Sequence, residues 1–468
     1  YYHGAKKEMM RARTPAAGVL FVNQDLTRGK PFGVLLRFSL PVIAGNLFQL
    51  FYTLADTVIV GRTLGSDALA AVGATTVVVY FVLCFIQGFT GGFGICLAQR
   101  FGARDERGQR ESVAISWVLS AAFAVVLTAL FCALAHPILL WIKTPADVYS
   151  MAYDYLFVVL LGTGATVFYN MISNMLRSLG DSRTPLIFLI FSALLNVGLD
   201  VAFIVPLGMG TAGAAWATVL SQLLSAVLSL AVGLRRFAVL RVGRAELKNW
   251  KKTARSHLRV GFPMGFQMSV MCIGQFAMQT AINAIGTDAI AGYTAATKVD
   301  QLSVLMNNAF GIALSSFVAQ NYGAGQYRRI REGVRASLLQ TEGCNLLMCA
   351  LLVATRKVSV LLFLDAPTAQ VVAYSGTYLL TVAPFYLLLG LLLVTRTAIQ
   401  SMGDSHTPFA ACVIELFMRI AGTAGLASLL APYGLRYVGI CLAHPLAWLG
   451  ALAILVPMYR KHVRAFPA

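Results

Sequence analysis

The chain carries the same short sequence patterns twice, and the second set follows the first at an offset of about 222 residues. Three pairs share this spacing: Pro41 with Pro263, Leu-Gly-Ser-Asp-Ala-Leu-Ala at 64–70 with Ile-Gly-Thr-Asp-Ala-Ile-Ala at 285–291, and Gly-Asp-Ser-x-Thr-Pro at 180–185 with 403–408. Matches in one order and at one offset indicate two copies of one architectural unit. An internal repeat in an apolar chain is typical of membrane transporters.

The composition places the two copies in a membrane. The 468 residues are 58% hydrophobic and only 12% charged, and a run of about 18 apolar residues is long enough to cross a bilayer. Twelve such runs are predicted: 34–59, 70–100, 112–142, 150–178, 183–207, 212–234, 257–284, 291–322, 332–363, 370–400, 407–431 and 437–459. Six per copy gives both copies the same orientation. The prediction is therefore an all-α integral membrane protein of twelve transmembrane helices in two parallel six-helix repeats.

The distribution of basic residues predicts the orientation. Of the 37 Lys and Arg, 30 fall on one side of the predicted spans and five on the other, while Lys298 and Arg419 lie inside spans. The positive-inside rule then places both termini in the cytoplasm, for a multi-pass protein of the cell (inner) membrane. The net charge of +18 follows from this topology, so we expect no nucleic-acid partner.

The predicted spans divide the chain into five segments. These are a cytoplasmic tail at 1–33, an N-lobe at 34–234, a basic linker at 235–256, a C-lobe at 257–459 and a tail at 460–468. The tail at 1–33 lacks the apolar core of a signal peptide, and we expect disorder there. Within the linker, 245–252 suits either a short helix on anionic headgroups or a solvated connector. The repeated Gly-Asp-Ser-x-Thr-Pro predicts a structural helix-turn-helix rather than a catalytic motif.

Acidic residues inside the first half point to a cation site. A carboxylate in a span is costly and normally faces a water-filled cavity or a partner. Asp56 has no cation within a helical turn, and Asn196 and Asp200 share one helix face because they are four residues apart. A site that exchanges a proton or Na⁺ explains all three. Carboxylate, amide and hydroxyl oxygens also suit a hard cation.

The charged residues of the second half favour a structural reading. Glu415 and Arg419 are spaced i and i+4, so they can neutralise each other as an ion pair. Lys298 and Asp300 are two residues apart and point to different faces, although Lys298 could balance acidic charge elsewhere. The sequence assigns no role to Glu342. The eight cysteines all lie in apolar runs, form no CxxC and are most simply packing residues.

Amide and aromatic side chains in the spans suggest a cavity. Asn170 and Asn174 share a face, Tyr169 directly precedes Asn170, and Gln49 and Tyr52 lie in the first apolar run. Walls that are both aromatic and polar accept bulky amphiphilic cations. The same amides could also form hydrogen bonds between helices. Each aromatic side chain, taken singly, is as expected for a packed core or a lipid-facing surface.

Together these motifs resemble the multidrug and toxic compound extrusion (MATE) transporters of the MOP flippase superfamily. The resemblance covers about 34–459 and depends on five elements: Leu40-Pro41, Ala-Asp-Thr-Val-Ile-Val-Gly at 55–61, the repeated Gly-Asp-Ser-x-Thr-Pro, Asn-x-x-x-Asp at 196–200 and Gly-Thr-Ala-Gly-Ala-Ala-Trp-Ala-Thr at 210–218. It implies two six-helix lobes in a V shape that open alternately to the two sides. The implied activity is antiport, in which organic cations or amphiphiles leave in exchange for H⁺ or Na⁺.

The resemblance also assigns residues. Those matching the family's cation-coupling cluster, and a possible Na⁺ site, are Asp56, Asn196, Asp200 and Thr218, while those matching its substrate cavity are Gln49, Tyr52, Asn170 and Asn174. One branch of the family couples through a glutamate in the seventh span, where this chain has Met271. The tenth span, 370–400, has no acid. The resemblance therefore implies coupling in the N-lobe.

Three other functions are compatible with a membrane protein. A flippase of a lipid-linked precursor would want a cationic cavity, whereas the candidates in the first half are acidic and neutral. A membrane enzyme would want a His/Asp or metal cluster, but the six histidines are scattered. A passive channel would not need buried acids in one half of a repeat. We expect a monomeric transporter without a cofactor, and the sequence does not choose between H⁺ and Na⁺ or name the substrate.

Overall fold

The computed structural model describes residues 25–362 and 367–467. Residues 1–24, 363–366 and 468 lie outside the described part, and with them most of the tail at 1–33 for which disorder is predicted. All regular secondary structure in the described residues is helical. The all-α prediction is therefore confirmed.

The described residues of the first half form seven α-helices. They are α2 (Pro31–Leu64), α3 (Ser66–Gly102), α4 (Glu106–Trp141), α5 (Tyr149–Leu161), α6 (Thr163–Ser178), α7 (Arg183–Ile204) and α8 (Gly210–Arg236). Those of the second half form seven more: α9 (Trp250–Asn283), α10 (Thr287–Gly323), α11 (Tyr327–Thr355), α12 (Ala369–Val382), α13 (Tyr386–Ser401), α14 (His406–Leu430) and α15 (Arg436–Arg464).

These helices account for the predicted spans. Ten candidate spans in the described residues are long and apolar enough to cross a membrane, counting α12 and α13 as one, and the bent pair α5 and α6 makes an eleventh. The remaining predicted span, 257–284, corresponds to α9, whose 34 residues include a strongly basic first part, Trp250–Arg259, that lowers the mean hydropathy of the helix. It begins seven residues before the predicted 257 because that basic part is helical. Of the two alternatives left open for 245–252, a separate short helix is not formed, because a 3₁₀ turn at Arg244–Leu247 is followed by the start of α9 at Trp250.

Two spans are broken at equivalent points of the repeat. α5 and α6 meet at Gly162 with a bend of 44°. α12 and α13 are separated by a single 3₁₀ turn, Ala383–Phe385, which contains Pro384. Glycine and proline are the usual causes of such breaks, because one lacks a side chain and the other lacks a backbone N–H. The sequence runs at 150–178 and 370–400 are continuously apolar, so hydropathy predicts neither break.

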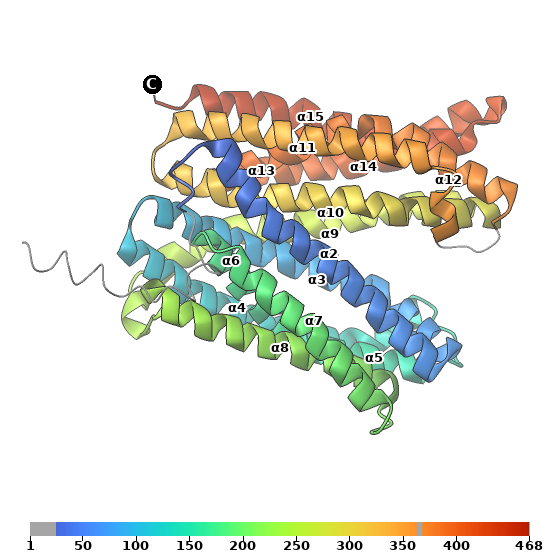
Figure 1. The fold of residues 1–468 in the computed structure, drawn as a ribbon, viewed down its shortest axis with the longest axis horizontal. Helices are drawn as coiled ribbons and strands as arrows, with labels where there is room; N and C mark the ends of the chain where they lie inside the picture. The colour runs from blue at the N-terminus through green and yellow to red at the C-terminus, as the bar shows by residue number, and fades with distance from the viewer. Residues whose placement is uncertain (1–24, 363–366, 468) are drawn as a thin grey trace, which may run out of the picture.

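The helices form two groups that meet along α2, α3, α9 and α10. α3 packs along α9 and α10, and α2 packs along α10 and α11. Figure 1 shows α2, α7 and α8 sloping away from α10, α11 and α15 with increasing distance from the C-terminus. The expected V-shaped arrangement of two six-helix bundles is thus present.

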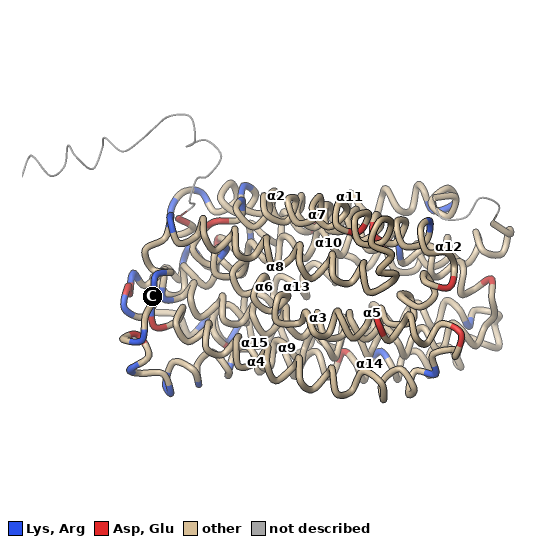
Figure 2. The backbone as a smooth tube through the Cα atoms, turned by 90° about the horizontal axis from the view of Figure 1, so that it is seen from below, with Lys and Arg blue, Asp and Glu red and all other residues tan. Residues whose placement is uncertain are grey.

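Charge distinguishes the two ends of this assembly. Figure 2 shows Lys and Arg gathered at the end where the C-terminus lies, and fewer of them at the opposite end. The first end, here called the basic end, includes Arg100–Arg110, Arg235–Arg259, Arg328–Arg335 and Arg460–Arg464. The predicted asymmetry of the loops is therefore a property of the folded molecule.

At the basic end, α3 and α10 approach so closely that only glycine fits. A Cβ atom at Gly102 would lie 1.8 Å from the carbonyl oxygen of Gln320, and a Cβ at Gly323 would lie 1.7 Å from that of Gln99. Any larger side chain requires the two helices to separate. The two glycines occupy equivalent places in the two copies of the repeat, so the crossing obeys its symmetry.

Two glutamine side chains reinforce this crossing. Gln99 Nε2 of α3 donates to the backbone oxygen of Ser401 at 2.8 Å, and Gln320 Nε2 of α10 donates to that of Ser178 at 2.8 Å. We call these four residues the glutamine latch. Each bond links one half of the molecule to the other, just before a Gly-Asp-Ser-x-Thr-Pro motif. The backbone N–H of Leu26 also donates to Gln320 Oε1, which fixes the start of the described chain against the latch.

The repeated motif forms a capped turn, as predicted. Asp181 accepts from the backbone N–H of Thr184 and from its hydroxyl, at 3.0 and 2.6 Å. Asp404 does the same with Thr407, at 3.1 and 2.7 Å. A carboxylate that satisfies free N–H groups at a helix start stabilises the turn, so the motif serves structure.

A buried ionic triad holds α13 and α14 together. Glu415 accepts from Arg396 Nη2 at 2.6 Å and from Arg419 Nη2 at 2.9 Å, and all three side chains are buried. The predicted ion pair of Glu415 and Arg419 is confirmed. Arg396 is one of the 30 basic residues counted on the more basic side of the spans, and that assignment is wrong, because its side chain is buried in the bundle and shares Glu415.

The glycine crossing makes a testable prediction. Replacing Gly323 by Ala forces a Cβ against the Gln99 carbonyl, and overpacking of this kind costs about 1–3 kcal/mol. We expect Gly323→Ala to lower the thermal unfolding midpoint of the purified protein. Gly73→Ala is the control, because Gly73 lies on α3 with open space around its Cβ position and should be neutral or stabilising. Equal midpoints for the two variants would contradict the close approach.

The triad makes a second prediction. Glu415→Gln leaves two buried guanidinium groups without a carboxylate, and removing one member of a buried ion pair costs about 3–5 kcal/mol. We expect a sharp loss of folded protein, measured as the monodisperse fraction after detergent extraction. Glu332→Gln is the matched control because Glu332 pairs with Arg328 on the surface at 3.1 Å, where such a pair contributes about 0–1 kcal/mol. Similar yields for both variants would argue against the triad.

Candidate functional site

Two carboxyl groups meet inside the first half of the molecule. Asp56 lies on α2, eight residues before its end, and Asp200 lies on α7, four residues before its end. The two carboxyl groups are in direct contact, and Asp200 is fully buried. Asp56 Oδ1 and Asp200 Oδ1 are buried and have no hydrogen-bond partner among the described residues. Two carboxylate oxygens of the site are therefore available to accept a hydrogen bond or to contact a cation.

Asn196 and Thr218 complete the surroundings of Asp200. With its amide turned so that both ends are satisfied, Asn196 donates to Asp200 Oδ2 at 2.9 Å. The amide oxygen then accepts from the backbone N–H of Thr218 at 3.1 Å and from its hydroxyl at 3.3 Å. Tyr52, one helical turn before Asp56, donates its hydroxyl to Thr218 Oγ1 at 3.4 Å. The four residues expected to couple the cation thus gather in one place, and Tyr52 joins them.

The structure adds Tyr155, which sequence reasoning missed. This tyrosine of α5 lies close enough to Asp56, Asp200 and Tyr52 to feel their charge. It is one of 17 tyrosines in the chain, and no local pattern marks it. Its place depends on how α5 packs before the break at Gly162, which the apolar run does not reveal.

The remaining predicted cavity residues lie apart from the acids. Asn174 donates to Thr90 Oγ1 at 3.1 Å, and Thr90 belongs to the half of α3 that ends at the basic end. Asn170 donates to the Thr166 backbone oxygen of its own helix. Gln49 is exposed on α2, two turns before Asp56. Because a helix rises about 1.5 Å per residue, these side chains lie well toward the basic end from Asp56.

No basic side chain of the described residues neutralises the acid pair. Among the described residues, neither Asp56 nor Asp200 forms an ion pair, although α3, α5, α7 and α8 surround them. Two charged carboxylates in contact repel each other strongly where water is scarce. A proton or a small cation removes that repulsion. The described residues hold no group of three or more His, Cys, Asp or Glu suited to a metal ion, so a cation here would depend on neutral oxygens as well.

The second half has a different polar interior. At the repeat offset, Asn196 corresponds to Arg419 and Asp200 to Thr423, so part of the Glu415 triad replaces the acid site. Asp300 of α10 accepts from the Tyr378 hydroxyl at 3.2 Å and from the Tyr386 hydroxyl. Lys298 is exposed and forms no ion pair among the described residues, so the expectation that it balances acidic charge is not met there.

Glu342 lies on α11 beside the break between α12 and α13. Its carboxylate is close to Asn345 and to Gly390, and its Oε2 has no hydrogen-bond partner in the described part. Asn345 in turn donates to the Tyr386 backbone oxygen at 2.9 Å. Besides Glu415, the interior of the second half therefore contains Asp300 and Glu342. Both lie beside neutral groups and are separate from the acid pair of the first half.

Comparison with known proteins agrees with this architecture. The family model described as MatE matches residues 41–202 and again 263–424. A probable multidrug resistance protein of Bacillus subtilis, YpnP, is 30% identical over 379 residues, which is 81% of this chain and 84% of that protein. A FAD transporter of Shewanella oneidensis is 25% identical over 82% of this chain and 85% of its own length.

Solved structures extend the comparison to the fold. A multidrug resistance MATE family transporter in an outward-facing conformation matches with a TM-score of 0.86 at 23% identity, over 96% of this chain and all of that one. The two matches of the family model begin at 41 and 263, the positions of the two prolines that mark the internal repeat. With its two copies of the family model and its twelve-helix fold, the chain belongs to the MATE family, whose members are multi-pass membrane transporters and not enzymes.

Proposed function

We propose that the protein is a secondary antiporter that exports organic cations or other amphiphilic compounds in exchange for H⁺ or Na⁺. The observation that carries the proposal is the pair of touching carboxyl groups, Asp56 and Asp200, without a basic partner among the described residues. Asn196 and Thr218 supply neutral oxygens beside them. Relatives whose names refer to multidrug resistance support the class of substrate.

The proposal includes the topology predicted from the sequence. The basic end faces the cytoplasm under the positive-inside rule, which puts both termini there in the cell (inner) membrane. The N-lobe is 34–234 and the C-lobe 257–459, joined by the linker 235–256, with tails at 1–33 and 460–468. The working unit is a monomer, because one chain already contains both halves of the repeat. No nucleic-acid partner is proposed, because the positive charge follows from the membrane topology.

Exchange follows from the charge of the acid pair. When the site is open outward, H⁺ or Na⁺ enters and neutralises Asp56 and Asp200, which removes the attraction for a cationic substrate. Neutralisation also removes the repulsion between α2 and α7, so that α2 can bend at Pro41, an interior proline of that helix. Substrate then leaves, and the loaded carrier turns inward and releases its cation. The cavity residues Gln49, Tyr52, Asn170 and Asn174 form the wall along which substrate approaches.

The glutamine latch is the gate of this cycle. Its two hydrogen bonds and the glycine crossing close the basic end, which corresponds to an outward-facing carrier. Inward opening requires α3 and α10 to separate, and both bonds must then break. Because the latch is symmetric in the repeat, the two halves can rotate apart without unfolding either bundle.

An anionic substrate is less well supported. A flippase of a lipid-linked precursor needs free positive charge in its cavity, whereas the two buried arginines of the second half share Glu415. The relative from Shewanella oneidensis is named as a FAD transporter, which indicates that substrates differ among similar chains. Export of a cationic dye distinguishes the two functions.

Replacing either acid tests the exchange site. We expect Asp56→Asn and Asp200→Asn to abolish efflux of a cationic dye from proteoliposomes, because neither amide can load and release H⁺ or Na⁺. Efflux is measured with a pH gradient and a Na⁺ gradient imposed separately, so that the wild type identifies the coupling ion. Asp154→Asn is the control because Asp154 is an exposed acid on α5.

The outcomes of this experiment are distinct. Asparagine variants that fold and insert but fail to transport, beside an active Asp154→Asn, support the proposal. Wild-type efflux by either acid variant would overturn the role of that residue. If the wild type moves dye with no gradient of either ion, the protein is not an antiporter of this kind.

A variant of the latch tests the gate. Gln99→Met with Gln320→Met keeps the side-chain volume but removes both donors. A hydrogen bond contributes about 1 kcal/mol, so losing the two latch bonds shifts the equilibrium toward inward opening by about 30-fold. The bond from the Leu26 backbone N–H to Gln320 Oε1 is also lost in this variant, so the 30-fold figure is the part due to the latch. The reporter is Ala319→Cys, at a fully buried position on α10, in a background without other cysteines. Labelling with a membrane-impermeant maleimide from the cytoplasmic face should rise.

The control for the gate is Gln109→Met. Gln109 is also buried at the basic end, but its amide donates to Arg100 within the same half. Labelling of the reporter cysteine should therefore stay at the level of the unmodified background. Equal labelling in the latch variant and this control would show that the two bonds do not hold the gate.

A further inference from the structure

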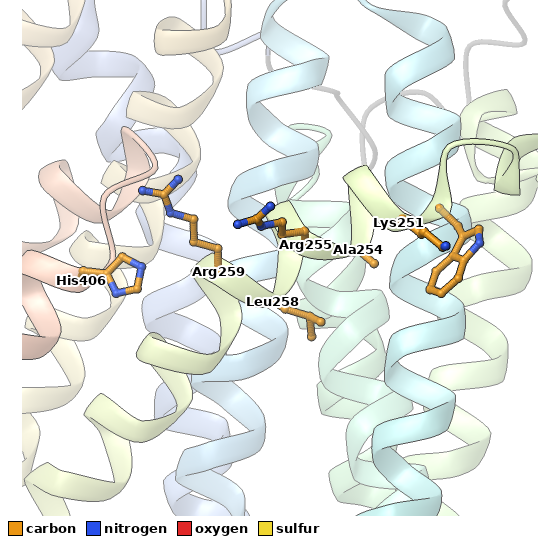
Figure 3. Close-up of a pocket in the computed structure, with 7 residues that line it drawn as sticks. Lys251, Ala254, Arg255, Leu258, Arg259 and His406 are labelled. Carbon is orange, nitrogen blue, oxygen red and sulfur yellow. The ribbon is translucent and has the colours of Figure 1, made fainter.

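We propose that a recess at the basic end, between the starts of α9 and α14, binds the headgroup of an anionic phospholipid. The recess has a volume of about 600 Å³ and is lined by Trp250, Lys251, Ala254, Arg255, Leu258, Arg259 and His406. Figure 3 shows His406, Arg259, Arg255 and Lys251 following one another along its length. This site is separate from the acid pair and from the path of the transported substrate.

The cations are arranged along one face of a helix. Lys251, Arg255 and Arg259 are four residues apart, so they project from successive turns of α9 on the same side. At a rise of about 1.5 Å per residue, the three span roughly 12 Å. All three side chains are exposed. A phosphate group placed in the recess would meet donors from two or three of them at once.

Three acids at this end of the molecule, Asp404, Glu246 and Glu111, are engaged by other side chains. Asp404 accepts from Thr407 and from His462, the latter at 3.2 Å. Glu246 pairs with Arg110 at 3.1 Å, and Glu111 pairs with Arg107 at 3.2 Å. Among the described residues, none of the three cations on α9 forms an ion pair. Their positive charge therefore faces the recess uncompensated, which favours an anionic ligand.

Apolar groups continue from the cations toward the membrane. Ala254 and Leu258 lie between the charged side chains, and Trp250, which is 52% exposed, stands at the outer edge. Phe262 and Phe266 follow Leu258 at intervals of four residues and remain 36% and 50% exposed. Charged side chains over the first turns of α9, followed by apolar surface from Leu258 to Phe266, match the headgroup and acyl-chain layers of a lipid leaflet. A free phosphate would use only the upper part of the site.

The position of the recess links the lipid to both halves of the molecule. α9 belongs to the second half, yet the Phe262 ring packs against Phe89 of α3 and Phe123 of α4. An acyl chain lying along Phe262 and Phe266 would border helices of both halves near their closed end. Basic pockets between membrane helices on the cytoplasmic side commonly bind acidic headgroups, and this one also lies beside the line along which the halves meet.

Binding of defined lipids to the full-length protein tests the proposal. Protein purified and depleted of lipid in a neutral detergent is titrated with phosphatidylglycerol, with phosphatidylcholine of the same acyl chains and with inorganic phosphate, and the thermal midpoint is followed. We expect only phosphatidylglycerol to stabilise the wild type. The variant Lys251→Gln, Arg255→Gln, Arg259→Gln should bind it about 100-fold more weakly, since each basic residue near an acidic leaflet contributes about fivefold.

A matched variant controls for overall charge. Arg104→Gln, Arg460→Gln, Lys461→Gln removes three exposed positive charges from the basic end outside the recess, and it should bind phosphatidylglycerol like the wild type. If the first triple variant is poorly folded, Arg255→Gln alone should weaken binding about fivefold. Unchanged binding in the recess variants, equal loss in the control, or stabilisation by phosphate as strong as by lipid would each overturn the proposal. Because Asp56 and Asp200 are intact in every variant, the result is independent of the exchange site.

Discussion

The crossing of α3 and α10 at Gly102 and Gly323, where the two halves touch backbone to backbone, determines the shape of the rest of the structure. A crossing with no room for a Cβ holds the helices together at one end, so the remaining lengths of α2, α7 and α8 diverge from the second half toward the other end. The glutamine latch reinforces this contact with two hydrogen bonds. In one the donor belongs to the first half and the acceptor to the second, and in the other the roles are reversed. The two halves are therefore closest at the basic end and farther apart at the opposite end.

The repeat supplies a symmetric frame, but the polar residues inside it are not symmetric. The first half holds Asp56 and Asp200 in contact with no basic partner among the described residues, while the equivalent region of the second half holds Glu415 between two arginines. A neutralised triad gains little from binding a cation, whereas the acid pair gains a great deal. The two halves therefore share one helical scaffold, but among the described residues only the first half has two acids in contact whose charge a bound cation could neutralise.

Much of this architecture could be predicted from the sequence. Apolar runs and the constant offset of the repeat predict the helices and their pairing, and the spacing of Asn196 and Asp200 predicts a shared face. The breaks at Gly162 and Pro384 could not be predicted, because a broken span is as apolar as an intact one. The inward turn of Arg396, the approach of Tyr155 and the latch also escaped prediction, since each depends on contacts between distant helices. Hydropathy predicts which segments lie in the membrane, but it does not predict which polar side chains contact one another between helices.

The proposed cycle requires that loading the acid pair outweigh the free energy that the glutamine latch contributes. Two latch hydrogen bonds contribute about 2 kcal/mol, whereas a buried, unpaired carboxylate costs several kcal/mol. A ligand shifts a conformational equilibrium only by its difference in affinity for the two states. In the proposed cycle, a proton or cation that neutralises the acid pair therefore carries more than enough free energy to outweigh the latch. If the gate were instead held by an ion pair as strong as the Glu415 triad, loading the site would not open it.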